Sequence, residues 1–386
     1  MNIIFDWEQR KLGEVFLYKQ GIQVPVEQQY SQKLPGLIRF IRISDIVSSN
    51  EPPRFINYHG TNLIKPDDLF MVRYGNPGMI SMGYSGVIAN NLFRLIPKKN
   101  IYTLFFYFLL IFENKRLNLL GSNTTMPALS FKALDTFYVN FPEKLSEQKV
   151  IGSLLKKLDS LITLQQRKLE LLKEIKKGLL QKMFADKSKF PILRFEGFHD
   201  EWEQCKLGEL YSYHNGKAHE QNQRSSGKYE LINLNSISVD GTLKSSGRYI
   251  NHADEILRQN DLVMILSDIA HGTLLGRVAI IPQDNKYVLN QRVALLRPIS
   301  KSENSNFMAP LINNNQRYFH KMGIGTSQLN ISKSTVIESL WQIPKIKEQS
   351  VIGNFLQNID HIIALQHQRL SKLDEIKKSL LQQMFI

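Results

Sequence analysis

Cysteine is almost absent from this chain, because Cys205 is the only one among 386 residues. A single thiol excludes an internal disulfide framework. It also excludes a zinc site built from several cysteines, since structural zinc takes four cysteine or histidine ligands. Low cysteine use is typical of proteins of the reducing cytoplasm, which is where we expect the chain to work.

Long hydrophobic runs are absent as well. The most apolar stretch, Ile101–Phe112 (IYTLFFYFLLIF), has twelve residues, whereas a membrane-spanning helix needs about twenty. We therefore expect this stretch to form a buried helix. The opening residues, MNIIFDWEQRKLGE, mix charged with apolar side chains, so no secretory signal peptide is predicted.

The motifs of the obvious catalytic classes are missing too. No G-x-x-x-x-G-K-[ST] loop is present, so the sequence predicts no ATP-driven activity. Adenine methyltransferases need a glycine-rich cofactor loop and an Asn/Asp-Pro-Pro-aromatic motif. The nearest match, Glu51–Phe55 (EPPRF), has a different acid first and an arginine before the aromatic residue. We predict no catalytic residue in this chain.

A metal-dependent nuclease is one alternative. Asp284-Asn-Lys286 fits the loose acid-x-Lys pattern, with Asp261 or Asp268 as a second ligand. The pattern has little specificity, because Glu174-Ile-Lys176 fits it inside a predicted helix. Sites for hard cations need several convergent oxygen ligands. We predict no metal ligands.

Acidic residues are outnumbered by basic ones, 35 to 49, which gives a net charge of +14. Such a field attracts polyanions and accelerates their capture, so nucleic acid is the leading expected partner. The length fits two or three domains of ordinary size.

An internal repeat divides the chain into two copies of one plan. The 38 residues from Glu147 match those from Glu348 without a gap, and 21 of the 38 positions are identical. A second match links WEQRKLGE at Trp7 with WEQCKLGE at Trp202. Each copy thus has a shared opening, a variable middle and a shared helical end.

Apolar residues in the shared ends recur every three and four positions, which is the spacing of a coiled-coil seam. The pattern predicts two long helices that pair antiparallel. The alternative is two amphipathic helices that each pack on their own domain. Gln165, Lys176, Gln366 and Lys377 interrupt the seam, and polar residues there tend to fix register. The seam residues are Ile151, Leu155, Leu158, Ile162, Leu169, Leu172, Leu179, Ile352, Leu356, Ile359, Ile363, Leu370, Leu373 and Leu380.

The variable middles, about Gln20–Pro142 and Gly216–Pro344, contain short alternating runs separated by turn residues, which indicates strands. Each middle also has one apolar helical stretch followed by a polar loop. In the second middle this loop is Gly323–Ser332 (GIGTSQLNIS), whose amides and hydroxyls suit base edges and phosphates. An ordinary turn in which Ser332 caps the next helix explains the same residues.

The order of these parts resembles the specificity subunit of Type I restriction-modification enzymes. The resemblance rests on the EQ-x-VIG…EIKK-x-LLQ-x-MF helices, on the W-E-Q-x-K-L-G-E openings and on Gly325–Ser332 (GTSQLNIS). Two departures are visible. The first loop, Gly121–Ser130, lacks the Gln-x-Asn-Ile core, and the first copy has no counterpart of Phe190–Phe198 (FPILRFEGF).

The resemblance implies an α+β fold in which two mixed α/β target-recognition domains form a pseudo-twofold tandem repeat, separated by two long antiparallel coiled-coil helices. The expected boundaries are a first recognition domain at 1–145, a central helix at 146–186, a linker at 187–200, a second recognition domain at 201–346 and a distal helix at 347–386. Each recognition domain would read one half of a bipartite, asymmetric DNA site. The helices would set the half-site spacing.

The resemblance also implies partners. The helices would dock two methyltransferase subunits, which hold S-adenosylmethionine and methylate adenine. Two nuclease-translocase subunits, which use ATP and magnesium, can join that core. No cofactor is expected in this chain itself. A coiled-coil scaffold whose heads bind protein is a further alternative, which the net charge disfavours.

The residues expected at the DNA are polar or basic side chains in or near the loops. In the first copy they are Arg42, Arg73, Tyr74, Asn76, Ser122, Asn123 and Thr124. In the second copy they are Lys217, Asn233, Asn235, Ser267, His271, Gly272, Thr273, Thr326, Ser327, Gln328 and Asn330.

Overall fold

The computed structural model describes residues 7–47, 51–121, 128–185, 188–219, 221–269, 272–300 and 303–385. These residues fall into two compact units. Unit 1 comprises the described residues of Met1–Gln166 and Arg369–Ile386, and unit 2 comprises those of Arg167–Gln368. Each unit contains one variable middle, called head 1 or head 2 below, together with parts of both long helices.

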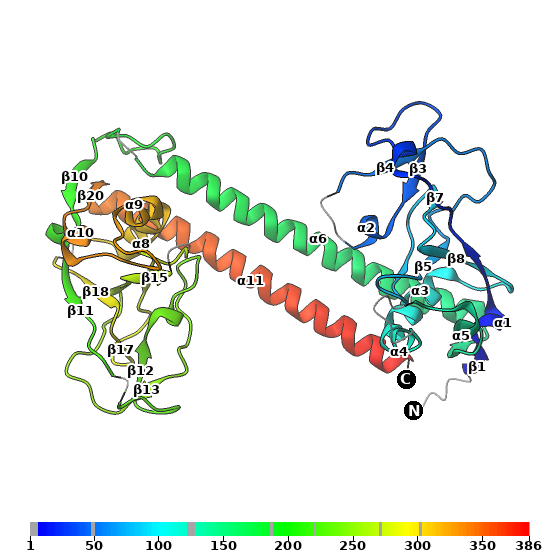
Figure 1. Ribbon diagram of the computed structural model, residues 1–386. Helices are drawn as coiled ribbons and strands as arrows, with labels where there is room; N and C mark the ends of the chain where they lie inside the picture. Colours follow the sequence, from blue (N-terminus) through cyan, green and yellow to red (C-terminus); the bar gives the residue numbers. More distant parts are fainter. Residues whose placement is uncertain are drawn as a thin grey trace. The chain divides into compact units, whose positions relative to one another are not determined.

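Head 1 is a mixed α/β domain (Figure 1). Its strands form a β1-β9 pair, a sheet of order β2-β8-β5-β6 and a sheet of order β4-β3-β7, in which only β3 and β7 run parallel. In chain order its elements are β1 (Trp7–Lys11), α1 (Leu12–Val15), β2 (Phe16–Gln20), η1 (Val26–Gln28), β3 (Ile38–Ile41), α2 (Ile43–Ile46), β4 (Arg54–Ile56), β5 (Leu69–Val72), β6 (Ile80–Ser81), β7 (Val87–Ile88), β8 (Leu92–Pro97), α3 (Thr103–Phe112), α4 (Asn114–Leu119), α5 (Phe131–Asp135) and β9 (Tyr138–Pro142).

Head 2 repeats this plan with a β10-β20 pair and sheets of order β11-β18-β14-β16 and β13-β12-β17. A β15-β19 pair is also described in head 2. The predicted duplication of one fold is therefore confirmed. In chain order its elements are β10 (Glu203–Lys206), α7 (Leu207–Leu210), β11 (Tyr211–Asn215), β12 (Tyr229–Ile232), η2 (Leu234–Ser236), β13 (Tyr249–Ile250), β14 (Leu262–Ile265), β15 (Ser267–Ile269), β16 (Val278–Ile280), β17 (Tyr287–Leu289), β18 (Val293–Pro298), α8 (Ser305–Asn314), α9 (Gln316–Met322), β19 (Gln328–Asn330), α10 (Lys333–Ile337) and β20 (Leu340–Ile343).

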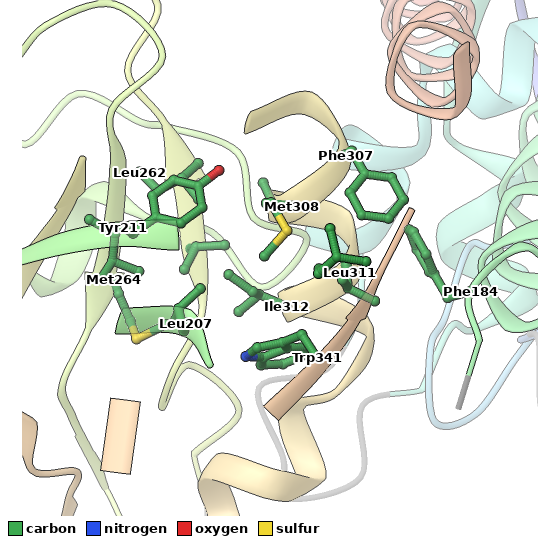
Figure 2. Close-up of a cluster of buried hydrophobic side chains, with 14 of the residues drawn as sticks. Phe184, Leu207, Tyr211, Leu262, Met264, Phe307, Met308, Leu311, Ile312 and Trp341 are labelled. Atoms are coloured by element: carbon green, nitrogen blue, oxygen red, sulfur yellow. The ribbon is translucent and has the colours of Figure 1, made fainter. Parts of the chain in front are cut away.

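The core of each unit forms around the apolar helix of its head. In head 1 the predicted buried helix is α3, which buries Phe105, Phe106 and Phe108 completely. In head 2 the corresponding helix is α8. Figure 2 shows Phe307, Met308, Leu311 and Ile312 from α8 among side chains of the neighbouring strands. The apolar run Ile101–Phe112 of head 1 thus contains a core helix, as predicted.

The two long helices, α6 (Leu145–Met183) and α11 (Ile346–Phe385), contribute to both units. Within unit 1 the start of α6 shares a hydrophobic cluster with the end of α11, through Leu155 and Phe385. Within unit 2 the start of α11 shares a hydrophobic cluster with the end of α6, through Leu356 and Met183. The helices are therefore antiparallel in each unit, as the seam predicted.

The seam itself is sheltered as the spacing predicts. Of its predicted residues, Ile151, Leu155, Ile162, Leu169, Ile352 and Leu356 are buried, and the remaining eight are partly buried. The two seam lysines have matching partners. Lys377 pairs with Asp159 in unit 1 and Lys176 pairs with Asp360 in unit 2. Asp360 lies 201 positions after Asp159, and Lys377 lies 201 positions after Lys176, which is the offset of the repeat. The two ion pairs are therefore equivalent, and they specify the same helix register in both units.

A repeated glutamine fixes each long helix to its head. Gln148 donates to the carbonyl of Pro142 at 2.8 Å and accepts from the Tyr102 backbone N–H at 2.9 Å. Gln349 makes the equivalent bonds, to Pro344 at 2.9 Å and from Asn304 at 3.0 Å. Both glutamines are buried, so these bonds satisfy polar groups that water cannot reach.

A repeated glycine lets the same helices approach closely. A Cβ on Gly152 would lie 2.9 Å from the Phe105 nitrogen, and one on Gly353 would lie 3.0 Å from the Phe307 nitrogen. We expect Gly152→Ala and Gly353→Ala to lower the thermal midpoint of unfolding, because overpacking costs about 1–3 kcal/mol. A Cβ on Gly178 of α6 would meet no described atom within 4 Å, so Gly178→Ala should instead raise the midpoint, since alanine favours a helix by about 1 kcal/mol. Equal effects at all three positions would contradict this interpretation.

Among the described residues, no helix combines the length and the apolar character that crossing a membrane requires. The helix α3 is apolar but has ten residues, and the long helices carry many charged residues.

Candidate nucleic-acid interface

The polar loop of head 2 is a closed turn on the protein surface. Ile324 and Asn330 exchange two backbone hydrogen bonds of 2.9 Å, which close the loop at its base. Gly325 has a φ of +133°, and a Cβ there would lie 1.9 Å from the Gln328 carbonyl oxygen, so this turn requires glycine. Thr326 and Ser327 at its tip are exposed. The loop therefore presents hydroxyl groups to solvent from a fixed backbone.

A second segment of head 2 holds this loop in place. Strand β15 pairs antiparallel with β19, which places Ile269 opposite Gln328 and Ser267 opposite Asn330. The Gln328 side-chain amide also donates to the Ser267 hydroxyl. The predicted site residue Ser267 thus lies beside Gln328 and Asn330, although some 60 residues separate them in the chain.

Asp268 organises the turn that follows β15. Its carboxylate accepts from the backbone N–H of Ile269 at 2.8 Å and from that of Leu274 at 2.7 Å. The Gly272 carbonyl contacts Nε2 of His320 from α9, and the Thr273 carbonyl accepts from Arg277 at 3.4 Å. Burial lowers the pKa of the Arg277 guanidinium from its usual value. These contacts tie the turn to α9 and to the body of the head.

Exposed lysines precede and follow the loop in the chain. Lys321 at the end of α9 and Lys333 at the start of α10 are exposed. The Lys333 ammonium lies 5.6 Å from the centre of the Tyr213 ring. Burial raises the pKa of the Tyr213 hydroxyl to about 12, so this ring stays neutral at physiological pH. The loop can therefore meet a polyanion with cations flanking it.

The capping interpretation of the loop is also correct for its last residue. The Ser332 hydroxyl accepts from the Thr335 backbone N–H at 3.1 Å and so caps α10. The exposed tip lies five residues before this cap. Capping explains Ser332 but leaves the side chains of Thr326 and Ser327 without a structural role.

Two predicted contact residues of this site hold other residues in place. Ser267 is 2% exposed and accepts from Gln328, so it positions that amide and does not reach the surface. Gly272 contributes its carbonyl to His320. His271 lies outside the described residues.

The remaining candidates of head 2 lie on other elements. Lys217 follows β11 and pairs with Asp254 at 2.9 Å, which raises the pKa of its ammonium group. Asn233 caps η2 by accepting from the Asn235 backbone at 2.9 Å. Asn235 is exposed. The β15-β19 pair includes none of these three residues.

Fewer of the predicted DNA-contact residues can be placed in head 1 than in head 2. Arg42 forms ion pairs with Glu51 at 3.0 Å and with Asp45 at 3.4 Å. Arg73 donates to the Gln20 side chain at 2.5 Å, and its guanidinium lies 5.0 Å from the centre of the Tyr74 ring and 4.6 Å from that of Phe131. Both arginines thus have structural partners. Asn76 is exposed. Ser122, Asn123 and Thr124 lie outside the described residues.

The acidic residues of the nuclease alternative do not converge. Asp261 is buried and forms an ion pair with Arg297 at 2.7 Å, Asp268 binds the backbone of its own turn, and Asp284 accepts from the Gln259 backbone at 2.9 Å. Within the described ranges no three His, Cys, Asp or Glu side chains come together as a metal site.

Sequence reasoning missed two apolar members of the loop surface. Ile269, at the end of β15, is 67% exposed, and Ile324, at the base of the loop, is 75% exposed. These two side chains add apolar surface beside the polar loop. The signal was present in the sequence as two isoleucines next to turn residues, but periodicity alone assigns such residues to buried strand faces.

Comparison with known proteins gives one consistent result. The family model for the Type I restriction modification DNA specificity domain matches twice, at residues 5–174 and 199–375. The specificity subunit of the Type I restriction enzyme MjaVIII from Methanocaldococcus jannaschii is 22% identical over 393 residues, covering 97% of this chain and 91% of the relative.

Two solved structures have a similar fold. The S subunit of the Type I restriction-modification system from M. genitalium matches with a TM-score of 0.70 and 15% identity, covering all of this chain and 98% of that one. A chain from a study of complex assembly and conformational transition of the type I R-M system matches with a TM-score of 0.56 and 15% identity, over 98% of this chain and 97% of that one.

Proposed function

The chain belongs to the Type I restriction-modification DNA specificity family and carries two copies of its domain, and from this premise we propose that each head reads one half of a bipartite DNA site. The family assigns sequence recognition, not catalysis, to such a subunit. The observation that carries the proposal is the turn Thr326–Asn330, which has an exposed tip at Thr326 and Ser327 and is held by β15.

The chemistry of this turn suits a base edge. A glutamine or asparagine amide can bind adenine through N6 and N7 together, and hydroxyls serve either bases or phosphates. Gln328 is partly buried with its amide next to Ser267, and Asn330 is exposed. The exposed Ile269 and Ile324 supply apolar surface of the kind that contacts a thymine methyl group. Lys321 and Lys333 would neutralise backbone phosphates.

We propose that the long helices dock the methyltransferase subunits, through a second apolar stripe that the antiparallel pair leaves open. In unit 1 this stripe includes Leu161 and Leu164, which are 41% and 61% exposed. In unit 2 it includes Leu171, Ile175, Ile362 and Leu365. Apolar residues at heptad spacing on an exposed helix face are typical of a partner-helix interface.

Charging this stripe should weaken docking. We expect Leu161→Glu with Leu164→Glu to raise the Kd for the methyltransferase subunit at least about tenfold, because the interface would bury unpaired carboxylates. Thr163→Glu with Gln166→Glu adds the same charge at exposed positions of α6 outside both stripes, and this variant should bind normally. Calorimetric titration measures both. Equal losses in the two variants would show that net charge, not the stripe, decides docking.

The cofactors then belong to the partners. We propose that S-adenosylmethionine binds the methyltransferase subunits and that ATP and magnesium bind nuclease-translocase subunits where these join. The chain would work in the cytoplasm, where its DNA lies.

One binding experiment separates this function from the alternatives. Filter binding with random duplex DNA, with and without the methyltransferase subunit, should show salt-sensitive binding that becomes sequence-specific in the complex. DNA cleavage by the isolated chain with magnesium would establish a nuclease. A lack of DNA binding under both conditions would support the alternative of a coiled-coil scaffold whose heads bind protein.

A further inference from the structure

A cavity of about 610 Å³ lies in unit 2, between the unit 2 parts of the long helices and head 2. Its lining includes the last turns of α6, part of α11, the turn that follows η2, strand β16 and helix α8. Every lining residue belongs to unit 2. Volumes of this size are typical of ligand-binding sites, which combine an apolar lining with a few convergent polar groups.

A closed turn of head 2 forms one wall of this cavity. The Ser238 backbone N–H donates to the Thr242 carbonyl at 3.0 Å, and the Gly241 N–H donates to the Ser238 carbonyl at 3.0 Å. Gly241 lies directly against α8, because a Cβ there would be 2.2 Å from the side-chain nitrogen of Asn313. The Asp240 carboxylate accepts from the hydroxyls of Ser238 and Thr242. The wall therefore has a fixed backbone, and its one acid already has hydrogen-bond donors.

Positive charge dominates the lining, which contains four basic and two acidic side chains. One acid belongs to the turn just described, and the other, Asp360, pairs with Lys176. In the part of unit 2 that the structure describes, the remaining cations, Lys173, Lys177 and Arg277, form no ion pair. The cavity thus has three cations without a counter-charge.

Arg277 is the least exposed of these three cations, since Lys173 and Lys177 are exposed and Arg277 is half-buried. Its guanidinium donates to the backbone carbonyls of Asn313 at 3.0 Å and Thr273 at 3.4 Å. Its Nε is buried and has no hydrogen-bond partner in the described structure. Because removing a cation from water without a counter-charge is unfavourable, an anion in the cavity would stabilise this side chain.

The corresponding positions of unit 1 carry different residues. The pairing of β6 with β5 and of β16 with β14 aligns Met79 with Arg277. The repeat offset of 201 aligns Asp374 of α11 with Lys173 of α6. Unit 1 therefore has an apolar and an acidic side chain where unit 2 has two of its three cations. The shared fold does not require these cations, which indicates a separate role for them in unit 2.

We infer that this cavity binds an acidic segment of another polypeptide, in which apolar side chains lie beside the carboxylates. The three cations bind the carboxylates, and the apolar part of the lining contacts the aliphatic side chains. That part includes Leu180, Leu243, Ile280 and Pro310. No aromatic side chain is among the lining residues that the structure describes, so a nucleobase would find no ring to stack on. The site does not depend on the DNA assignment of the loop.

Short labelled peptides test this chemistry. The full chain is titrated into a fluorescein-labelled peptide of alternating glutamate and leucine, and fluorescence anisotropy is followed. Two matched peptides have glutamine in place of glutamate or serine in place of leucine. We expect saturable binding of the first peptide and at least about tenfold weaker binding of the other two, because each lacks one of the two kinds of contact. The serine peptide has the full negative charge, so it controls for attraction to the basic chain as a whole.

Variants of the chain locate the bound peptide. Lys173→Glu combined with Lys177→Glu should weaken binding about tenfold or more, because each exchange replaces an attraction by a repulsion. Arg277→Met, which introduces the residue type that unit 1 has, should also weaken it. Lys372→Glu combined with Lys378→Glu makes the same charge change at exposed positions of α11 in unit 1 and should leave binding unchanged. A circular dichroism melt confirms that each variant is folded.

Three results would overturn the inference. The first is no saturable binding of the glutamate-leucine peptide. The second is an equal loss of binding in the two double lysine variants, since net charge alone would then explain the effect. The third is displacement of the peptide by adenosine monophosphate but not by an excess of unlabelled peptide, which would identify a nucleotide site.

Discussion

Lengthening both long helices by one heptad should widen the gap between the two halves of the methylated DNA site by about three base pairs. The insertions are placed after Leu169 and after Leu370, where the seam repeats every seven residues and stays in phase. Seven helical residues add about 10.5 Å, and DNA rises about 3.4 Å per base pair. The half-site sequences themselves should not change, because the heads are untouched.

The seam explains why both helices must grow together. Lys377 pairs with Asp159 in unit 1, and Lys176 pairs with Asp360 in unit 2. If only α6 is lengthened, seven residues are added between Asp159 and Lys176 but none between Asp360 and Lys377. The two ion pairs then cannot form at the same time. The matched control is therefore the single insertion after Leu169, which should abolish assembly of an active complex.

Activity of the doubly lengthened variant can also fall. Three added base pairs rotate one half-site by roughly 100° about the DNA axis, given about 10.5 base pairs per turn. Methylation mapping across a genome measures the gap between the half-sites directly, as long as the variant retains some methylation activity. An altered half-site, or an unaltered gap in an active enzyme, would show that the helices do not set the spacing.

Gln328→Ala should weaken binding to the cognate half-site of head 2 by about 1–3 kcal/mol, which is the value of a bidentate amide contact with adenine. The loss should be confined to cognate DNA. Ser267→Ala removes the hydroxyl that holds the Gln328 amide, so it should give a smaller loss of the same kind. Competition binding against half-site variants measures both effects.

A phosphate contact behaves differently and provides the control. Lys333→Ala should weaken all DNA sequences alike and reduce the slope of log K against log salt by about one, if Lys333 touches a phosphate. Unchanged cognate binding in Gln328→Ala combined with Asn330→Ala would refute the assignment of the loop to the DNA.

The repeated ends of the chain predicted the fold well, for a physical reason. Heptad spacing depends only on which residues are apolar, so Leu155 and Ile162 could be assigned to the seam without coordinates. The apolar run around Phe106 could likewise be assigned to the core, because exposing so many apolar side chains to water is unfavourable. Strands such as β5 and β14 followed from short apolar runs between turn residues.

The site was only partly predictable. The loop at Gln328 was visible from its composition, but its pairing with Ser267 is a contact between distant segments that no local pattern encodes. Arg42 and Arg73 look available in the sequence, whereas the structure gives each a structural partner. The roles of Gln148 and Gly152 were hidden in the repeat, because identity between the copies does not say what each residue contacts.

The central claim is that each head reads its own half-site. Its most direct test replaces the variable middle of head 2, about Gly216–Pro344, with that of head 1, about Gln20–Pro142, and maps methylated adenines across a genome. We predict a site whose two halves have the same sequence, the half that head 1 reads in the natural protein. Active methylation at a site whose halves still differ would contradict the account.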